Sequence, residues 1–238
     1  MSFKIKNLEG GNVRSPLLDK FHLNDMNFVR DDKRMIYNVM LDNGDPANAH
    51  LDETFELAGP REYLHFNPEK VKSAVATCGG LCPGLNSVIR SIVMESWYRY
   101  NSRDIVGIRY GYNGLNPAKG YEPVELNPTV VQTIHMDGGT ILGSSRGGTD
   151  NMEILVDTLE RLKINIFYTI GGDGTLKGAH RIAEMAAQRG LDLAVVGVPK
   201  TIDNDISHIQ RSFGFETAFS VEVDSITSAH VEAKGAYN

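Results

Sequence analysis

The sequence predicts an α/β fold with a mostly parallel sheet flanked by helices. From Val71 to the end of the chain, short apolar runs alternate with segments whose apolar residues recur at three- and four-residue steps. The first pattern is typical of buried strands and the second of amphipathic helices. Strands that alternate with helices of this length build parallel βαβ units in a layered sheet. The loops between them are rich in glycine, as at Gly79 and Gly171.

Composition narrows the class of protein. The chain has 238 residues, 41% of them hydrophobic, which suits one or two domains with a sizeable core. A formal net charge of -6 disfavours nucleic-acid binding, although local N–H groups and a few cations can still hold a phosphate. Cys78 and Cys82, the only cysteines, fit a reduced thiol state. We interpret them as small buried residues, because no nearby His or Cys completes a metal site. With no secretory signal and no apolar run of membrane length, we expect a soluble, cytoplasmic protein.

Residues 1–69 differ from the rest of the chain. They are rich in Asn, Asp, Gly and Pro, and residues 30–34 form a run of mixed charge. Residues 35–41 could form a short strand. We interpret residues 1–69 as an N-terminal extension and residues 70–238 as an α/β domain that binds the ligand.

The elements of the α/β domain follow in order. Strand is expected where a run is apolar, and helix where an apolar face recurs. Segment 111–128 holds several glycines and prolines and is expected to be a loop. Gly190 predicts the end of the helix before it, because glycine favours the left-handed cap position. The expected strands are 71–78, 104–110, 165–170 and 193–198, and the expected helices are 86–100, 130–137, 152–163, 176–189 and 216–236.

The run GGLCPG at 79–84 lies between the first expected strand and a helix. Glycines let the backbone approach a phosphate closely, and the helix start adds unpaired N–H groups. The spacing is neither GxGxxG nor GxxxxGK[ST], so neither a dinucleotide fold nor a P-loop is supported. Ordinary turn chemistry is the alternative explanation of this run.

Asp173 lies among glycines in the run GGDGT at 171–175. A carboxylate there can hold Mg²⁺ while neighbouring N–H groups meet phosphate oxygens. A tight turn with Asp as the turn former is the alternative. The order of strand, loop and helix favours the functional interpretation, because ligands of open α/β sheets bind at the carboxyl ends of strands.

The run PKTIDND follows the last expected strand. Asp203 and Asp205 are two residues apart, so in extended backbone both side chains would point into one pocket. One carboxylate can take a proton from a hydroxyl nucleophile, while Thr201 and Lys200 bind phosphate oxygens. A solvated acidic loop would explain the two aspartates, but not the Lys and Thr that precede them.

Arg146, in the run GSSRGG, is a further cation for this site. Its guanidinium group is always charged and matches the geometry of phosphate. Judged alone, an exposed loop arginine is the simpler explanation. Together with the three loops above, Arg146 completes a set suited to phosphate chemistry.

These runs together resemble the 6-phosphofructokinase family. GGLCPGLN is similar to the family's GGxxPGxN nucleotide loop. LGSSRGG, GGDGT and PKTIDND follow at similar separations, and SFGFETA resembles the helix start after the catalytic loop. GGDGT alone is a weak signal, because lipid and NAD kinases carry similar runs, whereas PKTIDND with GGxxPGxN is highly specific. The resemblance covers residues 71–238 and implies a Rossmann-like layered sheet, the first, donor-binding lobe of a two-lobe fold.

The resemblance also implies a reaction and a set of roles. The reaction is the glycolytic transfer of the γ-phosphoryl group of ATP to the 1-hydroxyl of fructose 6-phosphate, with Mg²⁺. Asp203 would be the base, and Asp173 would hold the metal. The full-length protein would be a homo-oligomer, either a dimer or a tetramer. The implied catalytic residues are Asp203, Thr201, Lys200 and Arg146; the donor contacts are Gly80, Arg146, Gly147, Gly172, Asp173, Gly174 and Thr175; the sugar-phosphate contacts are Thr201, Ile202, Asp203 and Asp205.

Two positions bear on the donor. Pyrophosphate-using members typically carry Asp where Gly174 stands, and that carboxylate would occupy the region of a nucleotide's α-phosphate. Lys200 points the other way, since pyrophosphate enzymes carry Lys there and many bacterial ATP enzymes carry Gly. The combination, with the long N-terminal extension, is similar to the plant- and trypanosome-type ATP-dependent group. ATP is therefore the expected donor and pyrophosphate the alternative.

The family's next motif, MGR on a strand after the last helix, does not occur before the chain ends at Asn238. We therefore expect a fragment with impaired activity that keeps most donor-site residues and lacks much of the sugar-phosphate site. A non-catalytic phosphate-binding subunit is a further alternative, which Asp173, Asp203 and Asp205 argue against. A lipid- or NAD-kinase-like protein is disfavoured by PKTIDND.

Overall fold

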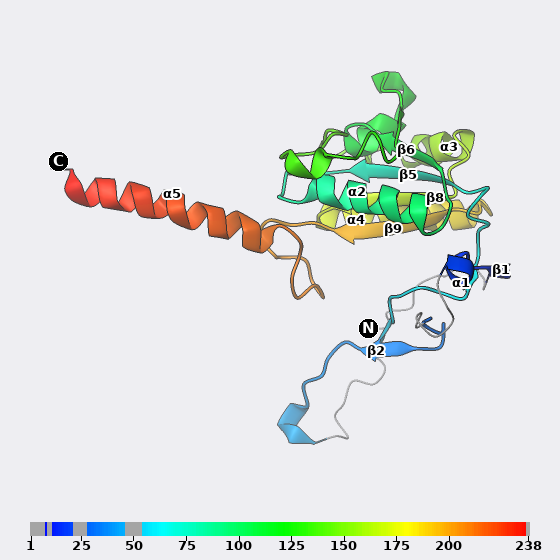
Figure 1. Cartoon of the computed structure of the whole chain (residues 1–238), viewed down its shortest axis with the longest axis horizontal. Helices are drawn as coiled ribbons and strands as arrows, with labels where there is room; N and C mark the ends of the chain where they lie inside the picture. The colour runs from blue at the N-terminus through cyan, green and yellow to red at the C-terminus, as the bar shows by residue number, and fades with distance from the viewer. Residues whose placement is uncertain (1–7, 9–10, 21–27, 46–53, 237–238) are drawn as a thin grey trace. The chain divides into compact units, whose positions relative to one another are not determined.

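The computed structural model describes residue 8 and residues 11–20, 28–45 and 54–236. It divides into two compact units. The smaller is Met1–Lys70 with Arg99–Asn101, and the larger is Val71–Tyr98 with Ser102–Asn238. Figure 1 labels their helices and strands.

The larger unit is built on a five-stranded sheet with the strand order β7-β6-β5-β8-β9. Four strands are parallel, and only β7 runs antiparallel, beside β6. The predicted α/β fold is thus confirmed, and each expected strand is found to within two residues at either end. The strands are β5 (Lys72–Thr77), β6 (Asp104–Ile108), β7 (Val124–Glu125), β8 (Ile166–Gly171) and β9 (Ala194–Pro199).

The described part of the larger unit has four α-helices, and each was expected from the apolar pattern. They are α2 (Leu85–Tyr98), α3 (Met152–Arg161), α4 (Asp173–Gln188) and α5 (Phe215–Gly235). The start of α4 is a correction, because the helix begins at Asp173 and not at residue 176. An aspartate in the first turn interacts favourably with the helix dipole, so the turn-like run GGDGT opens a helix.

Two other expectations were wrong. Residues 130–137 do not form a helix; only the 3₁₀ turn η5 (Ile134–Met136) is helical. The Asn127 side chain accepts a hydrogen bond from the Val130 N–H group at 3.0 Å, and such local bonds compete with helix formation. The expected loop 111–128 contains the 3₁₀ helices η3 (Gly111–Leu115) and η4 (Pro117–Lys119), and also β7.

The sheet has a helical layer on each face. One core cluster joins α3 and α4 to the sheet, with Leu155, Ile182 and Phe167 fully buried. The other joins α2 to the opposite face, through Ile89 and Ile170. Right-handed crossovers require this division, because the chain moves one way from β5 to β6 and the other way from β6 to β8 and β9. The direction changes next to β5, and ligand crevices of open sheets lie at such points.

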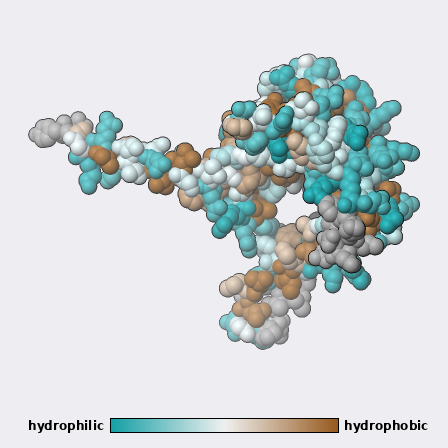
Figure 2. Space-filling view, in the orientation of Figure 1, coloured by the Kyte–Doolittle hydropathy of each residue, from teal (hydrophilic) through white to brown (hydrophobic). Residues whose placement is uncertain are grey.

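The last helix of this unit has no buried residue in the part of the chain that the structure describes. Figure 2 shows apolar side chains along it. Phe219 is 48% exposed and Ile226 is 63% exposed. None of the described helices is long and apolar enough to cross a membrane.

The smaller unit contains short elements. β1 (Val13–Arg14) pairs with β4 (Tyr63–Leu64), and β2 (Arg34–Ile36) pairs with β3 (Thr54–Glu56), both antiparallel. The expected strand at 35–41 is therefore shorter and starts one residue earlier. The other elements described for this unit are α1 (Leu17–Lys20) and the 3₁₀ turn η1 (Asp42–Gly44).

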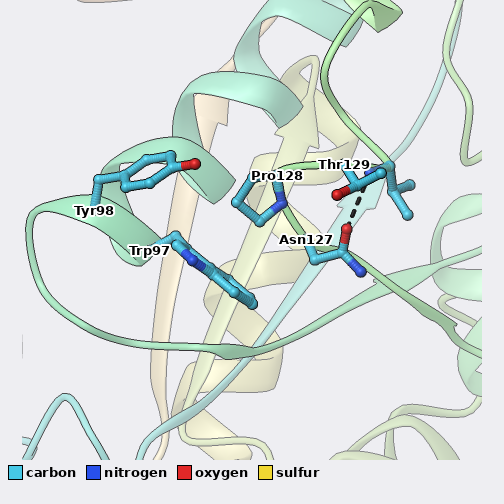
Figure 3. A pocket seen from close by; sticks show the side chains of 6 residues that line it. Trp97, Tyr98, Asn127, Pro128 and Thr129 are labelled. Atoms are coloured by element: carbon cyan, nitrogen blue, oxygen red, sulfur yellow. Dashed lines mark hydrogen bonds between the residues drawn. The ribbon is translucent and has the colours of Figure 1, made fainter.

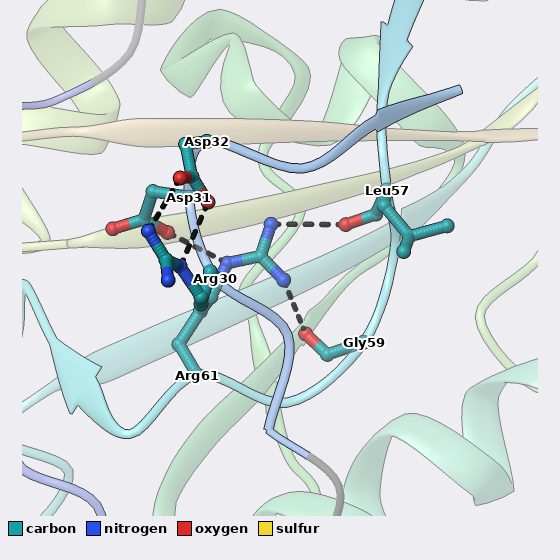
Figure 4. A network of polar contacts seen from close by, with 6 residues as sticks. All are labelled: Arg30, Asp31, Asp32, Leu57, Gly59 and Arg61. Carbon is teal, nitrogen blue, oxygen red and sulfur yellow. Dashed lines mark hydrogen bonds and ion pairs between the residues drawn. The ribbon is translucent and has the colours of Figure 1, made fainter. Parts of the chain in front are cut away.

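Arg61 organises the loops of this unit (Figure 4). Its guanidinium group donates to the Asp31 carboxylate at 2.7 Å and to the carbonyl oxygens of Gly59 and Leu57 at 3.0 and 2.9 Å. Arg30 and Asp32 form a separate ion pair at 2.6 Å. Arg61 satisfies two backbone carbonyls, so its loss would cost more than the loss of the exposed Arg30–Asp32 pair.

Candidate active site

The glycine loop leaves the carboxyl end of β5 and is tied to the loop at 143–148. Gly79 has φ +83°, a conformation that glycine adopts without steric cost. Its N–H group donates to the Ser145 carbonyl at 2.8 Å, and its carbonyl accepts from the Ser144 hydroxyl at 2.6 Å. These two bonds place the expected phosphate loop beside the loop that carries Arg146.

Arg146 extends toward the glycine loop. Its Nη2 atom lies 3.9 Å from the position that a side chain on Gly80 would start from. Within the described residues, Arg146 has neither a hydrogen bond nor an ion pair, and it is exposed. A cation without a partner beside a glycine backbone is suited to an incoming anion. Gly147, next to it, is exposed and has φ +73°.

The first turn of α4 forms the third part of this edge. Gly172 is the N-cap, and Asp173, Gly174 and Thr175 open the helix. In the described part of the chain the N–H groups of Asp173 and Gly174 have no acceptor, as expected for a helix start. Such groups, with the helix dipole, bind anions.

Two further contacts hold this turn, one to the Thr175 carbonyl and one to the Asp173 side chain. The Thr175 carbonyl accepts a hydrogen bond from the buried Tyr112 hydroxyl at 2.7 Å. The Asp173 carboxylate pairs with Lys177 Nζ at 2.6 Å, and both side chains are mainly exposed. Lys177 is a residue that the sequence analysis missed. Opposite charges four residues apart on a helix are the signal that could have found it.

Lys200 joins the fourth loop to the first. Its N–H group donates to the Gly171 carbonyl at 2.9 Å, which continues the pairing of β8 and β9. Its Nζ atom donates to the Gly80 carbonyl. Only 5% of the residue is exposed. Burial lowers the pKa of Lys200 below its ordinary value, and the nearby Arg146 charge acts in the same direction.

The rest of PKTIDND is held by its own side chains. Thr201 Oγ1 donates to Asp205 Oδ1 at 2.5 Å and accepts from the Asp203 N–H group at 3.2 Å. The expectation of extended backbone was wrong, because β9 ends at Pro199 and Asn204 has φ +53°. The side-chain alternation of a strand therefore does not apply to Asp203 and Asp205, and both are exposed, as is Ile202.

The two cysteines are free and buried, as expected. Burial raises the pKa of the Cys78 thiol to about 12 and also raises the pKa of Cys82. Both thiols are therefore neutral near pH 7 and add no negative charge near Lys200. Cys82 Sγ lies 3.2 Å from the Phe213 carbonyl, to which it donates.

The structure thus brings four predicted residues close together at one edge of the sheet. Lys200 reaches Gly80, Arg146 lies beside Gly80, and the Lys200 carbonyl lies 3.4 Å from the start of a side chain on Gly172. No described cluster of three or more His, Cys, Asp or Glu could hold a metal ion. Asp173 alone still fits Mg²⁺, which is commonly held by one or two carboxylates together with substrate phosphates.

A hollow of about 610 Å³ lies elsewhere, at the C-terminal end of α2 (Figure 3). It is lined by Trp97, Tyr98 and the segment from Asn127 to Val130. None of the predicted site residues lines it. It has no charged lining residue that could bind a phosphate.

Comparison with known proteins shows the family of this chain. Residues 72–238 match the family model described as Phosphofructokinase. The chain belongs to the phosphofructokinase family. That match covers all the strands and loops of the candidate site.

Three relatives are named as ATP-dependent 6-phosphofructokinases. The protein of Borreliella burgdorferi is 48% identical over 238 residues, which is 100% of this chain and 53% of the relative. That of Trypanosoma cruzi is 52% identical over 178 residues, 75% of this chain and 36% of the relative. ATP-dependent 6-phosphofructokinase 5, chloroplastic, of Arabidopsis thaliana is 48% identical over 188 residues, 79% of this chain and 34% of the relative. This phosphofructokinase chain therefore spans about half the length of the first relative and less of the other two.

Solved phosphofructokinase structures share the fold. The phosphofructokinase of Saccharomyces cerevisiae superposes with a TM-score of 0.58 at 25% identity, over 70% of this chain and 25% of that one. The T-state structure from Pichia pastoris gives a TM-score of 0.57 at 24% identity, over 63% of this chain and 16% of that one.

Proposed function

We propose that this chain carries the phosphoryl-donor side of a 6-phosphofructokinase, which transfers the γ-phosphoryl group of ATP to the 1-hydroxyl of fructose 6-phosphate. The observation that carries the proposal is the meeting of Gly80, Arg146 and Lys200 at one edge of the sheet. Relatives named ATP-dependent 6-phosphofructokinase are 45–52% identical over the aligned residues, which supports the same reaction.

In this proposal the donor phosphates lie against the glycine loop and the start of α4. Arg146 supplies positive charge, Lys200 holds the glycine loop through the Gly80 carbonyl, and the N–H groups of Asp173 and Gly174 donate to phosphate oxygens. Phosphoryl transfer needs mainly positioning and charge stabilisation, which these groups provide. Gly147, Gly172 and Thr175 shape the backbone around the donor.

Asp173 would hold Mg²⁺ beside the donor phosphates. When bound, Mg²⁺ neutralises phosphate oxygens and helps to orient the group that is transferred. The Lys177–Asp173 pair is solvent-exposed, and exposed pairs are worth about 0–1 kcal/mol, so Lys177 does not obstruct this role.

On the acceptor side, Asp203 would take the proton of the sugar 1-hydroxyl as its oxygen attacks the γ-phosphorus atom. Thr201 and Asp205, which are hydrogen-bonded to each other, and Ile202 would line the sugar phosphate. Because the chain spans only part of its relatives, turnover, assembly as a homo-oligomer and a cytoplasmic location are proposed for the whole protein. Impaired activity of this chain alone remains our prediction.

The choice of donor rests on Gly174. Apart from its chain neighbours and the backbone of its own helix, no atom lies within 4 Å of the position where a side chain would start there, so the structure has room for the side chain of Gly174→Asp to begin. The added carboxylate would repel the phosphates of a nucleotide. The buried ammonium group of Lys200 is also compatible with pyrophosphate, so pyrophosphate is tested as the alternative donor.

The test is calorimetric titration of this chain with Mg·ATP and, separately, with Mg·pyrophosphate. We expect saturable ATP binding that Gly174→Asp abolishes. Gly235→Asp, which adds the same charge at an open position near the end of α5, should leave binding unchanged. Pyrophosphate binding without ATP binding would overturn the donor assignment. Binding of neither ligand would overturn the proposal that this chain carries the donor side.

A further inference from the structure

The Lys200 side chain spans three strands of the sheet at their carboxyl edge. β9, which ends just before Lys200, is separated from β5 by β8. The ammonium group crosses this gap and donates to the carbonyl of Gly80, a residue 120 positions earlier in the chain. It also lies 3.6 Å from the position where a side chain on Gly79 would start. One side chain therefore fixes the glycine loop to the far end of the sheet.

This contact is the only hydrogen bond of Lys200 Nζ within the described part of the chain. A buried ammonium group is costly unless it is well paired. A single carbonyl partner is modest compensation, so a stability role alone does not account for Lys200. The contact instead acts on the conformation of the loop.

The geometry of the peptide bond means that this contact also sets the direction of the Leu81 N–H group. The carbonyl of Gly80 and the N–H group of Leu81 belong to one planar trans peptide, so they point in opposite directions. With the carbonyl turned inward to buried Lys200, the Leu81 N–H group is turned outward. Leu81 is 59% exposed, and its N–H group has no acceptor among the described residues. The unpaired Arg146 guanidinium lies beside Gly80.

We propose that Lys200 is a positioning residue that locks the Gly80–Leu81 peptide with its N–H group directed at the donor phosphate. The inference rests on the proposed function for the identity of the anion, but the lock itself exists in the ligand-free chain. Binding then needs no reorientation of the peptide, which is how preorganised donors gain affinity for anions.

The experiment compares the wild-type chain with Lys200→Met, which keeps the length of the side chain and removes the ammonium group. NMR relaxation of the Leu81 amide in ligand-free protein measures the lock, and titration with Mg·ATP measures its effect. We expect the Leu81 order parameter to fall from about 0.85 to below about 0.6 in the variant. ATP affinity should fall by about tenfold or more. Lys119→Met, an exposed lysine on η4, is the matched control and should change neither.

Each other outcome has a definite meaning. An unchanged order parameter with weaker ATP binding would make Lys200 a direct phosphate ligand and overturn the positioning role. If the order parameter falls but ATP affinity is unchanged, the Leu81 N–H group does not bind the donor, and the proposed positioning role of Lys200 is overturned as well. If wild type binds no ATP but Lys200→Met still loosens Leu81, the lock stands and the proposed function fails. If Lys200→Met does not fold, Lys200→Arg is used instead, because it keeps the charge and a hydrogen-bond donor. The Leu81 order parameter of this variant is expected to stay near the wild-type value.

Discussion

The Tyr112 hydroxyl donates a 2.7 Å hydrogen bond to the carbonyl of Thr175, inside the core. The bond joins the 3₁₀ helix η3 to the first turn of α4, where the donor is proposed to bind. Tyr112 is only 2% exposed, so no water replaces this partner if it is lost. A segment expected to be a plain loop thus supports the first turn of α4.

Tyr112→Phe should lower the free energy of unfolding by about 1 kcal/mol, because it removes a buried hydrogen bond while the Thr175 carbonyl keeps only its partner within α4. Urea denaturation followed by circular dichroism measures the change. Tyr121→Phe, at an exposed tyrosine, is the control and should have little effect. Equal losses of unfolding free energy in the two variants would mean that the Tyr112 hydrogen bond does not stabilise the fold.

Asn204 should matter for the shape of PKTIDND. Its side chain accepts from the Ser212 N–H group at 2.8 Å and donates to the Gln210 carbonyl at 3.0 Å, and its φ is +53°. Asn204→Ala loses both bonds and strains the backbone, whereas Asn204→Gly loses only the bonds. We expect alanine to be the less stable variant by about 1 kcal/mol in urea denaturation. Identical urea midpoints for Asn204→Ala and Asn204→Gly would show that the left-handed conformation is not retained in the variants.

Two glycines with similar φ angles should respond differently to alanine. Gly190 has φ +67° with open space around it, so Gly190→Ala should cost about 1 kcal/mol. Gly214 has φ +82°, and a side chain there would collide with the Pro83 carbonyl and Cys82 Sγ. Overpacking adds about 1–3 kcal/mol, so Gly214→Ala should melt at a clearly lower temperature. Thermal unfolding of both variants tests this, and equal melting temperatures would contradict the collision.

The stability of the chain should fall with rising pH through the titration of Cys78. Burial raises the pKa of this thiol from 9.0 to about 12, so the folded chain keeps a proton that the unfolded chain loses. Between those values the thiol destabilises the folded state by about 1.4 kcal/mol per pH unit. Urea denaturation at about pH 8 and about pH 10 should show a smaller loss for Cys78→Ala than for wild type. The same pH dependence in both would assign the effect to other groups.

The four parallel strands of the larger sheet could be predicted because each is a short apolar run bounded by polar or glycine residues, whereas the two-residue strand β7 was not predicted. The start of α4 could not, because Gly and Asp in GGDGT are typical of turns and their place in a helix depends on the preceding strand. The same limit applies to Asp203 and Asp205, whose spacing suggested extended backbone until Asn204 proved left-handed. The contact of Lys200 with Gly80 joins residues that no local pattern relates.

The contact between Lys200 and Gly80 affects when the chain can bind nucleotide during its synthesis. The glycine loop is made 120 residues before Lys200 emerges. At about 5–20 residues per second, the loop exists for about 6–24 seconds without its lock. Full nucleotide affinity would then arise only when β9 joins the sheet, and nascent chains that stop short of β9 would bind ATP about tenfold or more weakly.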